Sequence, residues 1–151
     1  GVETSFHKGG ITIKKNNRVS TKLEFNLSDF PDLAIPYVVS CAGLGVEVYL
    51  SGLKSLKIKE SDRLVSIKKE LSKFNVECEI NDHSIYVPKN QLIKYNGMVI
   101  DDHNDHRIPM SIAPLAIKTE RSIFFKDSLV VNKSYPLFWD DLKKLGFNIV
   151  N

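Results

Sequence analysis

Residues 46–87 read VEVYLSGLKSLKIKESDRLVSIKKELSKFNVECEINDHSIYV. The first seven of them are rich in residues that favour strands. Within residues 60–75 the apolar side chains recur at spacings of three and four, which predicts one face of a helix. Those side chains are Leu64, Ile67, Leu71 and Phe74. Two strand-like segments, joined across residues 81–83, follow the helix. The pattern is that of an α/β protein.

The segments before this stretch extend the alternation of strand and helix. LEFNL, residues 23–27, has alternating apolar and polar side chains and predicts a strand. Residues 28–45 predict a turn and then an apolar helix that ends at Gly43 or Gly45. The order of elements becomes βαβαββ, and we expect residues 21–90 to form one such unit.

Residues 1–20 predict a β-hairpin, because two strand-like segments flank Gly9 and Gly10. A hairpin must pack on another layer, and nothing before it supplies one. We therefore expect the chain to begin inside a larger protein, with the hairpin as the remainder of a preceding unit.

Residues 97–151 predict part of a second unit. The expected elements are a strand over residues 97–100, a helix over 105–117 that is kinked or bounded by Pro109 and Pro114, a strand over 122–125, a helix capped by Ser134 and Gly146, and a strand over 147–150. Self-similarity at a fixed offset supports the repetition. It aligns Asp32 with Asp105, Ile35-Pro36 with Ile108-Pro109, Ser61 with Ser134, and Phe74-Asn75-Val76 with Phe147-Asn148-Ile149.

The composition is that of an ordinary globular domain. Hydrophobic residues make up 42% of the 151 residues and charged residues 26%, and the net charge is +3. The basic residues are spread along the chain, which argues against a nucleic-acid partner. The longest uncharged run, Leu33–Val46, is shorter than the roughly 20 residues that a membrane span needs. No signal-peptide pattern opens the chain, so we expect a cytoplasmic protein without a membrane partner.

Ionisable residues gather where a strand gives way to a helix. They are Asp32 in the first such junction, Lys59, Glu60 and Arg63 in the second, Asp105, His106 and Arg107 in the third, and Lys133 before the last helix. In a repeated α/β layout these junctions can share one edge, where ligands are commonly bound. The cations Arg63, Arg107 and Lys133 suit a phosphate or carboxylate group.

Each of these residues alone also has a purely structural interpretation. Asp32 could cap a helix. Glu60 and Arg63 could form a surface ion pair at spacing i, i+3. Arg107 could pair with the nearby Asp105, and Lys133 could simply be solvated. Only their joint occurrence favours a site.

A metal site is the alternative for DDHNDH, residues 101–106, because His103 and His106 are spaced i, i+3 among carboxylates. The segment spans a predicted turn, however, and Arg107 follows it directly. No HExxH motif or CxxC pair accompanies it. Cys41 and Cys78 lie in apolar segments and are expected to be buried free thiols. From the residues alone we therefore favour an anion site over a metal site.

Four motifs resemble those of the 5-enolpyruvylshikimate-3-phosphate synthase family. They are FPDLA at residues 30–34, LKIKESDRL at 56–64, NDHR at 104–107 and NKSYP at 132–136. They occur in the family's order and at similar spacing, and the resemblance covers essentially the whole chain as the family's C-terminal part. It implies repeated βαβαββ units of an inside-out α/β barrel, here as an incomplete domain.

The resemblance also implies a reaction. Phosphoenolpyruvate donates its enolpyruvyl group to the 5-hydroxyl of shikimate 3-phosphate through a tetrahedral adduct, and phosphate leaves. The step belongs to the shikimate pathway, which leads to chorismate and the aromatic amino acids. It requires no metal and no organic cofactor. The hydroxyl must lose a proton, the alkene carbon must gain one, and cations must face the phosphate and carboxylate groups.

The family's catalytic roles carry over by position. Asp32 resembles the carboxylate that binds a shikimate hydroxyl and accepts its proton. Glu60 resembles the proton donor, and Lys59 the lysine that touches the shikimate ring and its target hydroxyl. His106 resembles the supporting active-site histidine. Asp105 is expected to orient its neighbours.

The family's phosphoenolpyruvate clamp corresponds to Arg63, Arg107 and Lys133. Residues 101–103 are expected to be only a polar lead-in. Ser55 departs from the family's pattern, because an asparagine that contacts the substrate often stands at this position.

The resemblance implies that an N-terminal domain of the same polypeptide supplies the other half of the site, so we expect this fragment to be inactive alone. Two alternatives to this function remain. The enzyme that transfers enolpyruvyl to UDP-N-acetylglucosamine shares the fold but uses a reactive cysteine in a polar loop. A non-catalytic module that binds phosphorylated metabolites is the other.

Overall fold

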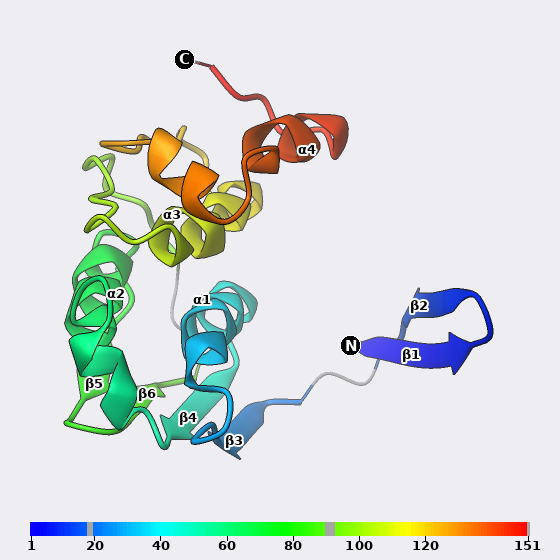
Figure 1. Ribbon diagram of the computed structural model, residues 1–151, viewed down its shortest axis with the longest axis horizontal. Helices are drawn as coiled ribbons and strands as arrows, with labels where there is room; N and C mark the ends of the chain where they lie inside the picture. Colours follow the sequence, from blue (N-terminus) through cyan, green and yellow to red (C-terminus); the bar gives the residue numbers. More distant parts are fainter. Residues whose placement is uncertain (18–19, 90–92, 151) are drawn as a thin grey trace.

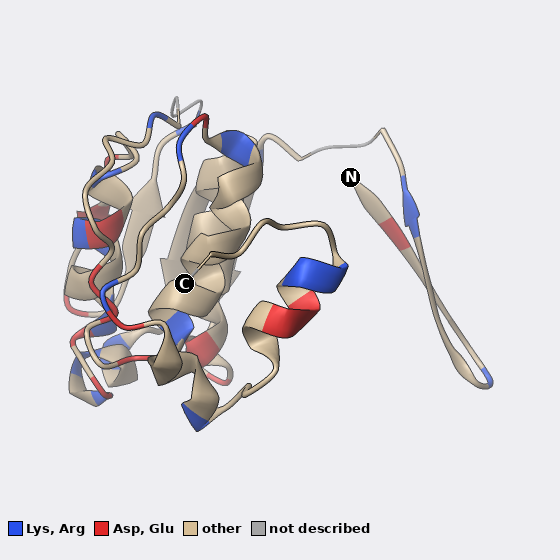
Figure 2. Cartoon of the chain, turned by 90° about the horizontal axis from the view of Figure 1, so that it is seen from above, with Lys and Arg blue, Asp and Glu red and all other residues tan. Residues whose placement is uncertain are grey.

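The computed structural model describes residues 1–17, 20–89 and 93–150. The expected hairpin is confirmed: β1 (Val2–His7) pairs antiparallel with β2 (Gly10–Lys15), with Phe6 opposite Ile11. All of its residues are exposed. The hairpin stands apart from the rest of the chain in two perpendicular views (Figures 1 and 2).

The main body is a four-stranded sheet covered on one face by two helices (Figure 1). Its strands, in spatial order, are β3 (Lys22–Asn26), β4 (Glu47–Ser51), β6 (Ile85–Val87) and β5 (Glu79–Ile80). β3 and β4 are parallel, and the other neighbours are antiparallel. The helices α1 (Ala34–Leu44) and α2 (Arg63–Ser72) connect them, so the order βαβαββ is confirmed for this stretch.

The four apolar side chains predicted for one helical face all lie in the core, although α2 ends at Ser72, before Phe74. Leu64, Ile67, Leu71 and Phe74 are each at most 1% exposed. The helix begins after Asp62, whose side chain accepts a hydrogen bond from the Val65 amide at 3.2 Å. Helix α1 ends at Gly45, which has a positive φ of 68°. The other candidate end, Gly43, lies within the helix.

Gly52, directly after β4, permits a close approach that brings the first junction near the second. Its φ is +78°, and a Cβ atom there would lie 2.6 Å from the backbone nitrogen of Ser28. Ser28 precedes the short 3-10 helix η1 (Pro31–Leu33), which carries Asp32. The end of β4 leads into η2 (Lys54–Ile58) and then to Lys59 and Glu60.

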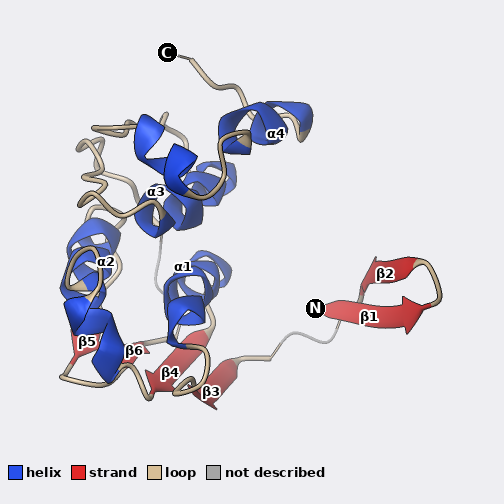
Figure 3. Cartoon of the chain, viewed as in Figure 1, coloured by secondary structure: helices blue, strands red, loops and turns tan. Residues whose placement is uncertain are grey.

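Residues 97–150 correct the expectation of a second strand-rich unit. The strands expected over 97–100 and 122–125 shrink to a single parallel bridge between Ile100 and Phe125. The strand expected over 147–150 does not form. Figure 3 shows only helices and loops in the described chain after β6. Short strands are stable only where a neighbour continues the ladder, and within residues 1–17, 20–89 and 93–150 no further strand pairs with these segments.

Proline limits the helices of this region. The predicted interruption at Pro114 is confirmed, Pro109 lies inside α3 (Arg107–Ile112) without ending it, and the cap expected at Ser134 is wrong. The helix expected over 105–117 is α3 followed by the 3-10 helix η3 (Ala113–Lys118), because Pro114 cannot donate an α-helical hydrogen bond. Ser134 does not cap α4 (Phe138–Lys144). It ends the 3-10 helix η4 (Leu129–Lys133) instead.

Pro136 disfavours helical backbone at the residue before it, which delays the start of α4. Gly146 lies one residue beyond the cap residue Leu145 and has a φ of +96°. α4 packs with η4 in a small second core around Val131, Phe138 and Leu142. Among the described helices, none combines the length and the apolar character needed to cross a membrane.

Candidate functional site

The site is organised around one buried arginine at the first residue of α2. Arg63 is 1% exposed, and its guanidinium contacts three carboxylates from three segments of the chain. Nε lies 2.5 Å from Oδ2 of Asp105, Nη1 lies 2.5 Å from Oδ1 of Asp32, and Nη2 lies 2.6 Å from Oε2 of Glu60. The pairing of Arg63 with Glu60 is therefore part of a cluster centred on a buried guanidinium and not an isolated surface pair.

Asp32 is the carboxylate that the cations share. Besides Arg63, it contacts Arg107 Nη2 through Oδ2 at 3.2 Å and lies 3.7 Å from Lys59 Nζ through Oδ1. Its side chain is 35% exposed, and Asp32 is the second residue of η1, whose N-cap is Phe30. Capping, the structural interpretation of Asp32, is thus wrong. The residue is a partly open carboxylate held among three cations.

Asp105 is the buried anchor of the third junction. It is 0% exposed, and its Oδ1 accepts a hydrogen bond from the backbone amide of Arg107 at 3.0 Å while Oδ2 pairs with Arg63. Solvent and ligand have no access to it, and its contacts fit the orienting role expected from the sequence. The guanidinium of Arg107 remains partly exposed, with 32% of its side chain accessible.

Lys133 meets the site through the loop and not through the carboxylates. Its Nζ lies 2.7 Å from Oδ1 and 3.0 Å from the backbone oxygen of Asn104. Asn104 directly precedes Asp105. The ammonium group is thereby held beside the third junction. Among the described residues, it makes no hydrogen bond or ion pair with the first junction (residues 31–33) or the second (residues 59–63).

His106 completes the set and raises the question of a metal. Glu60, Asp105 and His106 can each offer one ligand atom, and these atoms lie within 4.8 Å of one another. Arg63, however, already pairs with Glu60 and Asp105, so a metal ion would place a second cation beside the same two carboxylates. Nδ1 of His106 is buried and has no hydrogen-bond partner among the described residues. The arrangement suits exchange of protons and contact with anions better than metal binding.

Residues 101–103 are more than the polar lead-in expected from the sequence. Asp102 is 7% exposed and accepts a hydrogen bond from the Asn104 amide at 2.7 Å. Nε2 of His103 lies 2.8 Å from Oε1 of Glu70, which is fully buried. The amide of His103 donates to Asp101 and holds the pKa of that carboxyl below its usual range.

The sequence prediction overlooked Glu70 and its neighbour Lys73, which is 7% exposed. A signal was present, because Glu70 follows Ile67 by three positions and precedes Phe74 by four. It therefore falls on the apolar face of α2.

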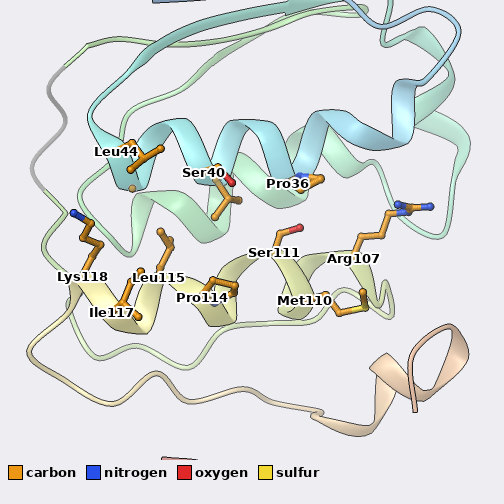
Figure 4. A pocket seen from close by; sticks show the side chains of 12 residues that line it. Pro36, Ser40, Leu44, Arg107, Met110, Ser111, Pro114, Leu115, Ile117 and Lys118 are labelled. Carbon is orange, nitrogen blue, oxygen red and sulfur yellow. The ribbon is translucent and has the colours of Figure 1, made fainter. Parts of the chain in front are cut away.

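An apolar cavity of about 400 Å³ lies beside the charged cluster, between α1 and the α3–η3 segment (Figure 4). Its walls include Val39, Leu44, Met110 and Leu115. Arg107 stands at one end, so the cavity adjoins the charged site without containing it.

Both cysteines are buried, Cys41 within α1 and Cys78 in the segment that joins α2 to β5. Burial raises the pKa of the Cys41 thiol, and it raises that of Cys78 to about 11.

We expect Cys78 to react with iodoacetamide at pH 8 at least ~100-fold more slowly in the folded chain than in urea, because the thiolate is the nucleophile. The folded rate should still rise about tenfold per pH unit up to pH 10, measured by mass spectrometry of the Cys78 peptide. A folded rate that levels off near pH 9 would contradict this expectation.

Comparisons with known proteins agree on one family. The model for EPSP synthase (3-phosphoshikimate 1-carboxyvinyltransferase) matches residues 5–142. A 3-phosphoshikimate 1-carboxyvinyltransferase from Bacteroides fragilis is 40% identical over 150 residues, which cover 99% of this chain and 36% of that protein. One from Sulfurisphaera tokodaii is 35% identical over 147 residues, with coverages of 97% and 35%.

Among solved structures, EPSP synthase from Acinetobacter baumannii superposes with a TM-score of 0.64 and 26% identity. The alignment covers 78% of this chain and 28% of that one. The mixed α/β fold therefore matches part of that structure. The chain spans only about a third of the length of the relatives it matches.

Proposed function

The chain belongs to the EPSP synthase family, and on this premise we propose that it supplies one half of an active site for enolpyruvyl transfer. The reaction moves the enolpyruvyl group of phosphoenolpyruvate to the 5-hydroxyl of shikimate 3-phosphate and releases phosphate. The observation that carries the proposal is the convergence of Asp32, Glu60, Asp105 and Arg107 around the buried Arg63. A proton acceptor, a proton donor and accessible cations thereby lie within one cluster.

Asp32 and Glu60 are the proposed proton-transfer groups. Both are bonded to Arg63 and both are more than one-third exposed at the side chain, so each can meet a substrate. In the forward step the hydroxyl oxygen bonds to the central carbon of phosphoenolpyruvate, its proton passes to Asp32, and Glu60 protonates the methylene carbon. In the second step the adduct loses phosphate and a methyl proton, which restores the double bond.

Arg107 and Lys133 are the cations best placed to reach the anionic groups of phosphoenolpyruvate. Arg107 is partly open and Lys133 is exposed, whereas Arg63 is buried and its Nε and both Nη atoms already contact carboxylates. The proposed role of Arg63 is accordingly twofold. It holds the carboxylates in place, and its positive charge attracts an anionic ligand that binds beside them. Lys59 and His106 border the same space and complete the half site.

The remaining contacts are proposed to come from the rest of a family polypeptide. The relatives are almost three times as long as the aligned part, which leaves room for a second domain. A site with walls on one side only cannot enclose two phosphorylated substrates or exclude water from them. Residues 1–151 alone are therefore expected to be inactive.

Phosphate release tests the proposal. Phosphoenolpyruvate and shikimate 3-phosphate are supplied to residues 1–151 and, separately, to the complete polypeptide encoded by the reading frame, with omission of shikimate 3-phosphate as the control. We expect release only from the complete polypeptide and no effect of a chelator. Turnover by residues 1–151 would overturn the half-site proposal. A folded complete polypeptide without turnover would overturn the substrate assignment and favour a non-catalytic module for phosphorylated metabolites.

A further inference from the structure

A second buried charged network lies on α2, apart from the cluster around Arg63. Glu70 is fully buried, and its carboxylate receives three contacts. Oε2 lies 2.5 Å from Lys73 Nζ and accepts the backbone amide of Asp101 at 3.1 Å, while Oε1 lies 2.8 Å from Nε2 of His103. Lys73 in turn donates to the backbone oxygen of Val99 at 2.8 Å. The proposed reaction uses none of these groups.

Apart from Lys73 at the end of α2, the partners of Glu70 and Lys73 lie in the segment that leads to the third junction. The segment turns sharply, because His103 and Asn104 both have positive φ, 52° and 57°. Asparagine adopts this conformation readily, but for most other side chains, including that of His103, it costs free energy that surrounding contacts must offset. The backbone amide of Asp105 closes the turn by donating to Asp102 O at 2.9 Å. The next residues, Asp105 to Arg107, carry the site's groups.

The loop is therefore attached to α2 at two points that lie about two helical turns apart. One is the pairing of Asp105 with Arg63 inside the site, and the other is the bonding of Asp101 and His103 to Glu70 outside it. Two attachments fix both the position and the direction of a loop, whereas one would leave it free to rotate. A buried ion pair is not needed for stability as such, since apolar residues can often replace it without loss.

We propose that Glu70 is a positioning residue for the active site. Through His103 and Asp101 it fixes the loop so that Asp105 pairs with Arg63, His106 lies beside Glu60 and Arg107 reaches Asp32. Lys73 balances the charge of Glu70 and ties the start of the same segment. The expected effect of Glu70 on the reaction rate rests on the proposed enolpyruvyl transfer. Its expected effect on the position of the loop does not.

The kinetic test uses the complete polypeptide in the phosphate-release assay, at a temperature where circular dichroism shows every variant folded. We expect Glu70→Gln to lower kcat/KM about 10- to 100-fold, because small displacements of reacting groups have effects of this size. Glu120→Gln, on an exposed turn, is the matched control and should stay within about twofold. Lys73→Met should reduce the rate more than Lys69→Met, which removes the same charge from the exposed face of α2.

A rescue at His103 separates positioning from a general loss of structure. His103→Ala should lower kcat/KM about tenfold, whereas His103→Gln, whose side-chain amide can still donate to Glu70, should stay within about threefold of the parent. Neither replacement favours positive φ, so the pair differs chiefly in the hydrogen-bond donor. Equal losses in the two variants, or a Glu70→Gln rate within twofold of the parent, would overturn the proposal.

Amide hydrogen exchange tests the structural part without any assumption about the reaction. In the same polypeptide, Glu70→Gln should speed exchange of the Arg107 amide, which bonds to Asp105, at least ~10-fold. The Ser66 amide, which bonds to Asp62 O inside α2, should change less than about twofold. Equal acceleration at both amides would overturn positioning. If the parent polypeptide releases no phosphate, but Glu70→Gln speeds exchange at the Arg107 amide and not at the Ser66 amide, the proposed function is overturned while the positioning role of Glu70 stands.

Discussion

Replacing Arg63 with methionine is expected to lower the free energy of unfolding of residues 1–151 by about 3–5 kcal/mol. The substitution keeps a long side chain at the start of α2 but removes the cation that three carboxylates share. Asp105 is 0% exposed and would be left as a buried charge without its partner. Urea unfolding followed by circular dichroism measures the change.

Two variants calibrate this prediction. Arg121→Met removes the same charge from an exposed position and should change the free energy of unfolding by no more than about 0.5 kcal/mol. Asp105→Asn, added to Arg63→Met, removes the uncompensated charge and should recover about 1 kcal/mol or more. A loss below about 1 kcal/mol for Arg63→Met would show that the three carboxylates do not depend on this arginine.

Glu60→Gln is expected to lower kcat of the complete polypeptide by about 10²- to 10⁴-fold. Glutamine keeps an acceptor for Arg63 Nη2, which lies 2.6 Å from Glu60 Oε2, so the cluster should survive. It cannot deliver a proton to the methylene carbon. Phosphate release measures kcat, and equilibrium binding of each substrate should stay within about threefold of the parent.

The split between kcat and affinity decides the role of Glu60. Glu120→Gln again serves as the exposed control. A raised KM with unchanged kcat would assign Glu60 to substrate binding and would contradict its role as proton donor. An unchanged rate would remove Glu60 from the reaction altogether.

The sequence by itself determined the features that depend on near neighbours in the chain. The spacing of Leu64, Ile67, Leu71 and Phe74 predicted the buried face of α2, and all of these side chains are in the core. Gly9-Gly10 predicted the hairpin turn correctly. Such signals are local, because helix periodicity and turn chemistry act over a few residues.

The motifs indicated the family, which the comparisons show, and predicted which residues form the candidate site. They did not give the contacts of those residues. The same Glu60–Arg63 spacing was equally compatible with a pair on the surface, and the burial of Arg63 resolves that alternative.

Only the tertiary structure decided how the charges pair. Arg63 meets Asp105 across 42 residues of sequence, and Arg107 meets Asp32 across 75. Glu70 became a loop anchor only because packing of α2 excluded water from it and brought His103 to it. The strands expected after residue 97 were lost for the converse reason, since a strand needs a partner that its own sequence does not encode. Long-range pairing depends on the packing of whole segments, and local patterns carry no information about it.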